Sequence, residues 1–131
     1  MIGIVIVSHS HKVAEGVKEL ADQMAQGQVK IVAAGGVDDH TIGTNAERIH
    51  NALLEAQSDD GVLVLLDLGS AVMSAQMAVE MLDADAQERV KLSEAPLVEG
   101  AVIAAVEASI GNTLEQVTAA AEAAATMRKL G

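Results

Sequence analysis

The sequence predicts an α/β fold, a three-layer αβα sandwich around a central, mainly parallel sheet of four strands. Two features of the chain lead to this prediction. Short apolar runs alternate with longer segments whose apolar residues recur at helical spacing, and strands joined by helices pair in parallel through right-handed crossovers. The runs are also solidly apolar, which is typical of strands that helices cover on both faces. We expect the strand order 2-1-3-4.

The predicted strands differ in how apolar they are. They are Ile2–Val7, Val29–Ala33, Val62–Leu66 and Arg89–Ser93. The first and third contain no polar side chain, so both of their faces are expected to be buried. The fourth is more polar than the others, which predicts a place nearer an edge of the sheet.

The first predicted helix follows the first strand, and Gly27 can end it. The second starts at Thr44, because Thr44 and Glu47 form a capping-box pattern. Helices in such a fold turn their apolar side chains towards the sheet. The residues predicted to face inwards are Val13, Val17, Leu20, Ala21 and Met24 in the first helix, and Ile49, Leu53 and Ala56 in the second.

Three further helices are predicted in the second half of the chain. One follows the Asp67-Leu68-Gly69-Ser70 segment, and the next starts at Pro96, since proline suits the start of a helix. The last is capped by Asn112 with Glu115 and ends near Lys129, where the helix dipole favours a basic residue. The residues predicted to face inwards are Val72, Ala75, Val79 and Leu82, and then Val98, Ala101, Val102 and Ala105.

The composition predicts a single domain spanning residues 1–131 and argues against several classes of function. The chain has no aromatic residue, so it has no platform on which nucleic-acid bases could stack. Its net charge of −11 repels nucleic acid and anionic lipid, and a basic protein is a better partner. The chain has no cysteine and no basic segment ahead of its first apolar run. These absences fit the cytoplasm and argue against a secretory signal.

The strongest candidate for chemistry is His9, which lies between the end of the first strand and the start of the first helix. In open parallel sheets, functional groups gather at the carboxyl ends of the strands. A neutral imidazole is a nucleophile at physiological pH, and its second nitrogen can donate to an orienting acceptor. We interpret His9 as a nucleophile that carries a phosphoryl group. A helix cap or a metal ligand is the alternative on the residues alone.

Asp67 follows the third strand much as His9 follows the first. If these strands are neighbours, the two side chains meet above the sheet, and the carboxylate can hold the imidazole in one tautomer. The alternative is a turn residue or a helix cap. Small residues and hydroxyls at helix N-termini suit an anion, although glycine and serine are also ordinary turn residues. The residues predicted to bind the phosphate are Ser8, Ser10, Gly69 and Ser70.

The other histidines carry weaker signals. His9 and His11 have a spacing that could chelate a metal, but no third ligand beyond Asp67 is evident. His40 and His50 are expected on the solvated surface. The chain also has no glycine-rich nucleotide loop, no serine nucleophile elbow and no convincing carboxylate cluster for magnesium. We therefore expect neither a bound metal nor a cofactor.

Four segments, in this order, resemble the mannose-type IIA domain of the bacterial phosphotransferase system. They are Ile4-Val-Ile-Val-Ser-His9-Ser, the Gly35-Gly36-x-Asp-Asp loop with Ile42-Gly43-Thr44, Leu66-Asp67-Leu-Gly69-Ser70, and Ala95-Pro96-Leu-Val-Glu99-Gly100. The resemblance covers essentially the whole chain and is strongest to the members that serve phosphoenolpyruvate-dependent dihydroxyacetone kinases. His11 stands where other members commonly have a different residue.

The resemblance implies a phosphohistidine carrier, and it implies roles for two residues. His9 would accept a phosphoryl group from the carrier protein HPr, and Asp67 would orient His9. The group would then pass to ADP held by the DhaL subunit, so that dihydroxyacetone bound to the DhaK subunit becomes dihydroxyacetone phosphate. The resemblance also implies a sheet with helices on both faces and a homodimer.

Two other functions stay open at this point. One is the IIA component of a mannose- or fructose-type sugar permease, which would pass the phosphoryl group to a IIB protein. The other is a non-catalytic regulatory or metal-binding module that uses His9, His11 and Asp67. A carrier should expose an apolar docking patch near its histidine, and Met73 and Met77 are candidates. Both could instead pack in the core or in a dimer interface.

Overall fold

The computed structural model describes residues 1–131 and contains one four-stranded parallel sheet in the order β2-β1-β3-β4. The predicted strand order and parallel pairing are therefore confirmed. The strands are β1 (Gly3–Ser8), β2 (Ile31–Gly35), β3 (Val62–Leu66) and β4 (Val90–Ser93). The most polar strand, β4, lies at an edge, as its sequence predicted. The second strand starts at Ile31 and ends at Gly35, two residues later at each end than the predicted Val29–Ala33.

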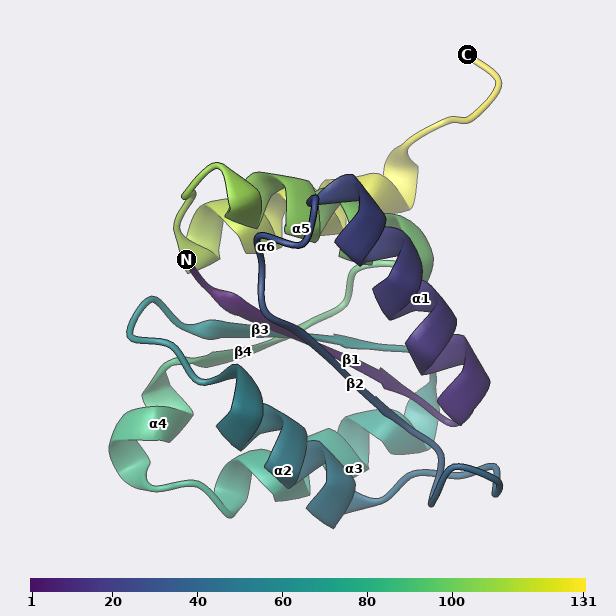
Figure 1. Ribbon diagram of the computed structural model, residues 1–131, viewed down its shortest axis with the longest axis vertical. Helices are drawn as coiled ribbons and strands as arrows, with labels where there is room; N and C mark the ends of the chain where they lie inside the picture. Colours follow the sequence, from purple (N-terminus) through teal and green to yellow (C-terminus); the bar gives the residue numbers. More distant parts are fainter.

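Helices cover both faces of the sheet, which confirms the three layers (Figure 1). The helices are α1 (His11–Met24), α2 (Ala46–Ala56), α3 (Gly69–Glu80), α4 (Ala84–Glu88), α5 (Leu97–Ser109) and α6 (Leu114–Ala123), followed by the 3-10 turn η1 (Ala124–Thr126). Helices α1, α5 and α6 lie on one face, and α2, α3 and α4 lie on the other. The short α4 was not predicted. None of the helices combines the length and apolar character needed to cross a membrane.

The central strand β1 supplies both halves of the core. Its alternate side chains point to opposite faces, because the side-chain period of a strand is two residues. Ile4 and Ile6 pack with the α1 and α5 layer, whereas Val5 and Val7 pack with the α2 and α3 layer. All four are fully buried, which explains why the run is apolar without alternation.

The inward faces of several helices differ from the prediction. In α1, Val17 and Ala21 are buried as predicted, but the third buried residue is Ala14, while Val13, Leu20 and Met24 are exposed. The reason is close packing: a β-carbon at Gly35 of β2 would come within 2.7 Å of the Ala14 β-carbon. Only small side chains fit between elements that approach so closely. Likewise, Val72 of α3 and Val98 of α5 were predicted inside but are exposed, and alanines occupy those buried faces.

Two predicted helix caps were one residue away from the observed ones. Asn45, not Thr44, caps α2, because its side chain accepts from the amides of Glu47 and Arg48 at 2.9 and 3.3 Å. Thr113 rather than Asn112 caps α6, in a reciprocal capping box with Gln116. Helix α6 ends at Ala123, so Lys129 lies well beyond it.

Candidate active site

The carboxyl ends of β1 and β3 bring the main candidate residues together. The two strands are hydrogen-bonded neighbours, with Val7 paired to Leu66. His9 and Asp67 follow these paired residues closely in the chain, so both lie above the same edge of the sheet. Helices α1 and α3 begin immediately afterwards, and their N-termini flank the pair.

Asp67 holds His9 by two separate hydrogen bonds. The ring Nδ1 of His9 lies 3.0 Å from Oδ1 of Asp67, and the backbone amide of His9 donates to Oδ2 at 2.9 Å. The Asp67 carboxylate also accepts from the Leu68 amide at 2.7 Å and from the Ser8 hydroxyl at 2.9 Å. One carboxylate therefore fixes both the backbone and the ring of His9.

These contacts keep Asp67 ionised. Partial burial opposes ionisation, but the donated hydrogen bonds outweigh it and hold the pKa of Asp67 below its ordinary value. The donors are the His9 and Leu68 amides, the Ser8 hydroxyl and the His9 ring. An ionised carboxylate has no proton to donate, so the proton between it and the imidazole belongs to Nδ1 of His9.

The other ring nitrogen of His9 is then free to react. With the proton on Nδ1, Nε2 carries a lone pair, and the Ser70 hydroxyl lies 2.7 Å from it in position to donate. The His9 side chain is partly exposed, with about a quarter of its surface open to solvent. Ser70 is also exposed, so a large reactant can reach Nε2.

The N-terminus of α3 adjoins this nitrogen and is well suited to an anion. Its N-cap, Leu68, makes no side-chain capping hydrogen bond to the first amides of the helix. A β-carbon at Gly69 would meet no atom within 4 Å, so there is open space beside this turn. The positive end of a twelve-residue helix thus lies beside Nε2 of His9.

The four residues predicted to bind phosphate fall into two groups. Gly69 and Ser70 lie on the Nε2 side of His9. Ser8 lies on the other side and is fully buried, with its hydroxyl donating to Asp67 and accepting from the Ser10 amide at 3.0 Å. Ser10 caps α1 by accepting from the Val13 amide.

The loop between β2 and α2 supports His9 from a third side, and its role was missed in the sequence. The Gly43 amide donates to the carbonyl of His9 at 2.9 Å, and the Gly36 amide donates to the carbonyl of Ser8 at 3.1 Å. Thr44 joins the loop to α3, because its hydroxyl lies 2.6 Å from that of Ser74. The sequence marked this loop by its glycines, which are typical of turns, and by its place among the four segments that resemble the family.

His11 does not join His9. Its Nδ1 lies 3.5 Å from a carboxylate oxygen of Asp39, in the loop that follows β2. No group of three or more metal-binding side chains comes together anywhere in the structure. His40 is exposed, as predicted, while His50 is partly buried.

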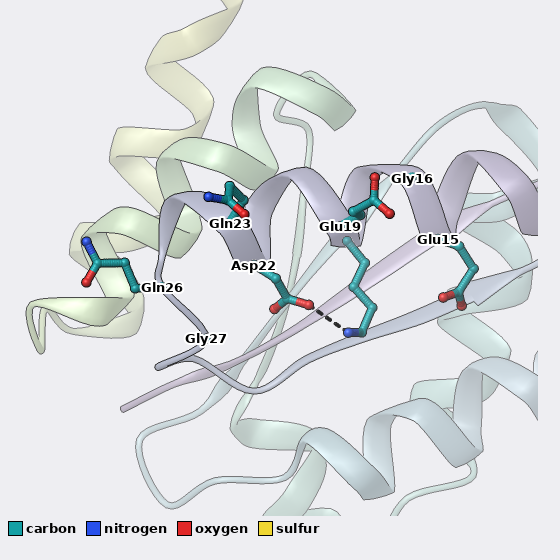
Figure 2. A pocket seen from close by; sticks show the side chains of 8 residues that line it. Glu15, Gly16, Glu19, Asp22, Gln23, Gln26 and Gly27 are labelled. Atoms are coloured by element: carbon teal, nitrogen blue, oxygen red, sulfur yellow. Dashed lines mark hydrogen bonds and ion pairs between the residues drawn. The ribbon is translucent and has the colours of Figure 1, made fainter.

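A hollow on the outer face of α1 is separate from this site (Figure 2). Its lining is polar and includes Glu15, Lys18, Glu19 and Asp22. Lys18 is already paired with Asp22 at 2.7 Å, and the two other carboxylates of the lining, Glu15 and Glu19, have no ion-pair partner. An acidic lining repels phosphate, so the edge of the sheet at His9 is the better candidate site.

Comparison with known families identifies the family of the chain. A model of the EIIA-man family, described as "PTS system fructose IIA component", matches residues 3–118. The chain belongs to this family. The matched region contains His9, Asp67 and Ser70 together with all four strands of the sheet.

Several relatives of this EIIA-man chain are named as DhaM subunits. This chain is 38% identical over 117 residues to the "PEP-dependent dihydroxyacetone kinase 2, phosphoryl donor subunit DhaM" of Listeria innocua, and the match covers 89% of this chain and 94% of that one. It is 43% identical over 120 residues to the corresponding DhaM subunit of Escherichia coli and 42% identical to that of Providencia stuartii. The chain spans 25% of the length of these two relatives.

Solved structures share the fold of this EIIA-man chain. The crystal structure of the unknown-function protein EF1359 superposes with a TM-score of 0.83 at 37% identity, covering 94% of this chain and 95% of that one. The dihydroxyacetone kinase of C. freundii in complex with AMP-PNP and Mg²⁺ gives a TM-score of 0.62 at 14% identity. The match covers 95% of this chain and 25% of the kinase, and it shows a shared fold only.

Proposed function

We propose that this chain is the phosphoryl donor subunit of a phosphoenolpyruvate-dependent dihydroxyacetone kinase. His9 accepts a phosphoryl group from phospho-HPr and transfers it to ADP bound in the DhaL subunit, which then supports phosphorylation of dihydroxyacetone on DhaK. The observation that carries the proposal is the arrangement around the His9 ring, in which Asp67 contacts Nδ1 and Ser70 contacts Nε2. The names of the DhaM relatives support the choice of pathway.

The transfer needs little from the protein besides positioning and charge. The lone pair on Nε2 of His9 attacks phosphorus in line with the leaving nitrogen of phospho-HPr. One phosphorus–nitrogen bond forms as the other breaks, and the proton on Nδ1 stays between the ring and Asp67. In the second transfer, an oxygen of the β-phosphate of ADP attacks phosphorus and Nε2 leaves with its lone pair restored.

The residues around His9 divide the remaining work. Asp67 stabilises the positive charge that the ring gains when Nε2 is phosphorylated. The Ser70 hydroxyl and the first amides of α3 stabilise the equatorial oxygens of the phosphoryl group. Ser8 holds Asp67 rather than the phosphate, since its hydroxyl donates its hydrogen bond to the carboxylate. The chain itself supplies no metal or cofactor in this proposal.

The test is phosphoryl transfer in a reconstituted system. The protein is incubated with phosphoenolpyruvate, enzyme I and HPr, and its intact mass is measured. We expect a gain of one phosphoryl group that is absent from His9→Gln and retained in His11→Gln. A gain that persists in His9→Gln would contradict the assignment of the nucleophile.

The acceptor is tested separately. The phosphorylated protein is mixed with ADP-loaded DhaL, and ATP formation is measured. ATP is expected only for a dihydroxyacetone kinase subunit. Transfer to a IIB protein without ATP formation would instead favour a sugar permease component, which the description of the family model also names.

The assembly and location of the chain are part of the proposal. We propose that residues 1–131 act as a single domain, that the chain forms a homodimer in the cytoplasm, and that HPr and DhaL are its partners. Light scattering combined with size-exclusion chromatography gives the oligomeric state. A monomer at all concentrations would rule out the dimer.

A further inference from the structure

We propose that His11 is a positioning residue for phosphoryl transfer at His9. Its imidazole faces Asp39 in the loop between β2 and α2, residues 36–45, and this loop in turn holds the backbone of His9. The inference rests on the proposed function, because it concerns how His9 is kept in line with the phosphoryl donor. It assigns a role to a histidine that the transfer itself does not use.

The backbone of His9 is anchored at both of its polar groups. The amide donates to Asp67 at 2.9 Å, and the carbonyl accepts from the Gly43 amide at 2.9 Å. Gly43 has a φ of +136°, and a β-carbon there would lie 2.7 Å from Cγ2 of Val37, so the position requires glycine. The place of this loop on the protein therefore sets one of the two anchors of His9.

The tip of the loop needs an anchor outside the loop itself. Residues 37–42 are all exposed. The tip is closed by its own hydrogen bonds, in which the Val37 amide donates to the Thr41 carbonyl at 2.9 Å and the His40 amide donates to Asp38 at 2.8 Å. These bonds fix the shape of the turn but not its position, so the anchor must be a side chain that reaches a neighbouring element.

Asp39 is that anchor. Its Oδ1 accepts from Arg48 of α2 at 3.0 Å and lies 3.5 Å from Nδ1 of His11 at the start of α1. Arg48 also donates to the carbonyl of Gly35, at the end of β2, at 3.0 Å. One carboxylate therefore joins the tip of the loop to two helices and, through Arg48, to the sheet.

Two features of α1 favour the contact between His11 and Asp39. Nδ1 of His11 is shielded from solvent and has no hydrogen-bond partner, so its burial costs free energy unless a nearby carboxylate compensates. The first turn of α1 also contains no acidic residue, although the positive end of a helix favours a negative charge. Asp39 supplies this charge from the loop, and both effects hold the loop against α1.

These contacts form a closed chain around His9. His11 follows His9 by two residues and faces Asp39, and four residues after Asp39 the Gly43 amide returns to the His9 carbonyl. Loss of the His11 contact loosens this carbonyl anchor and leaves the bonds from His9 to Asp67 in place. Nε2 of His9 then remains a nucleophile but is less well aligned. In-line transfer depends strongly on alignment, so we expect a lower maximal rate and no change in the KM for a small donor.

The test compares variants of His11 with a matched change in the same loop. His11→Leu removes the N–H and retains an apolar side chain, whereas His11→Asn retains an N–H near the position of Nδ1. His40→Leu makes the first change at an exposed histidine of the loop and is the control. Each variant is phosphorylated with phosphoramidate at varied concentration. The phosphorus–nitrogen bond to the leaving ammonia breaks as the bond to Nε2 of His9 forms, and this small donor needs no docking surface.

We expect the maximal rate to fall about three- to tenfold in His11→Leu, with the KM for phosphoramidate unchanged. The loss is partial because Arg48 and the contact between Thr44 and Ser74 still hold the loop. His11→Asn and His40→Leu should match the wild type. A wild-type rate in His11→Leu, or a rate in His11→Asn as low as that in His11→Leu, would overturn the proposal.

A second measurement follows the loop without any phosphoryl donor. Hydrogen exchange of the Gly43 amide, measured by NMR, should lose protection in His11→Leu and keep it in His11→Asn. Unchanged protection in His11→Leu would show that the loop does not depend on His11, and the proposal would fail while the proposed function stood. Failure of both phosphoramidate and phospho-HPr to label wild-type His9 would instead contradict the proposed function.

Discussion

The backbone amide and the ring Nδ1 of His9 donate to the two different oxygens of the Asp67 carboxylate, at 2.9 and 3.0 Å. Asp67 thereby sets the position of the residue and the orientation of its ring at once. The same carboxylate accepts two further hydrogen bonds, from Leu68 and Ser8. The contacts make Asp67 the centre of the candidate site, and they lead to predictions for both reactivity and stability.

Replacing Asp67 with asparagine should impair both. In Asp67→Asn an NH₂ group takes the place of one carboxylate oxygen and faces donors instead of accepting from them. We expect the rate of His9 phosphorylation to fall by a factor on the order of 10² to 10⁴, and unfolding in urea to show a loss of about 1–3 kcal/mol. Asp85→Asn, at an exposed position in α4, is the control and should change neither quantity. A wild-type rate in Asp67→Asn would show that the carboxylate does not orient the ring.

The lowered pKa of Asp67 predicts how stability depends on pH. The folded protein takes up this proton at a lower pH than the unfolded chain, whose ordinary value is 3.8. The contribution is therefore present in full above that value and is lost as the pH falls through the folded-state pKa below it. Urea unfolding from pH 7 down to pH 3 should show a difference between wild type and Asp67→Asn that shrinks at the acidic end. A difference that grew on acidification would contradict the direction of the shift.

Removal of the Ser8 hydroxyl and removal of the Ser70 hydroxyl should affect different properties of the protein. Ser8→Ala leaves Asp67 short of one buried donor, so it should lower the free energy of unfolding by about 1–2 kcal/mol. Ser70→Ala removes an exposed contact to Nε2, so stability should stay within about 0.5 kcal/mol of the wild type. The rate of phosphoryl transfer should nevertheless fall about tenfold. Chemical denaturation measures the stability of the two variants, and rapid-quench phosphorylation measures their transfer rates. Equal effects of the two substitutions on stability would contradict the prediction.

Two glycines test the close approach of α1 to the sheet. A β-carbon at Gly35 would lie 2.4 Å from the Ser10 carbonyl and 2.8 Å from the His11 α-carbon, so Gly35→Ala must push the start of α1 away. We expect a loss of about 1–3 kcal/mol and slower phosphorylation, because His9 immediately precedes this helix. Gly16 lies in the exposed interior of α1 with no atom near its β-carbon position, so Gly16→Ala should stabilise the protein by about 0.5–1 kcal/mol. Thermal unfolding of both variants measures these effects. An unchanged stability of Gly35→Ala would show that α1 does not pack so closely against β2.

Local signals predicted the sheet better than the helix faces. The run from Val62 to Leu66 was predicted with its observed bounds, because five consecutive apolar residues between turns are typical of a strand buried on both faces. In α1 the prediction was right for Val17 and Ala21 but wrong for Leu20 and Met24, which hydrophobicity favours and which are exposed. The approach of α1 to Gly35 instead buries the small Ala14. The distance between a helix and a strand depends on the side chains of both elements. These side chains lie far apart in the chain, so local patterns in the sequence do not show how closely they pack.

The sequence by itself determined the alternation of strands and helices, the edge position of β4 and the position of His9 at a strand end. These features depend on residue type and periodicity, which are local. The tertiary structure decided that Nε2 of His9 is the free nitrogen, that Ser8 serves Asp67 and that His11 is directed to Asp39. It also decided that Met73 and Met77 of α3 are exposed rather than packed in the core of the chain. Each of these depends on distances between residues far apart in the chain, and only the pairing of β1 with β3 and the packing of the helices set those distances.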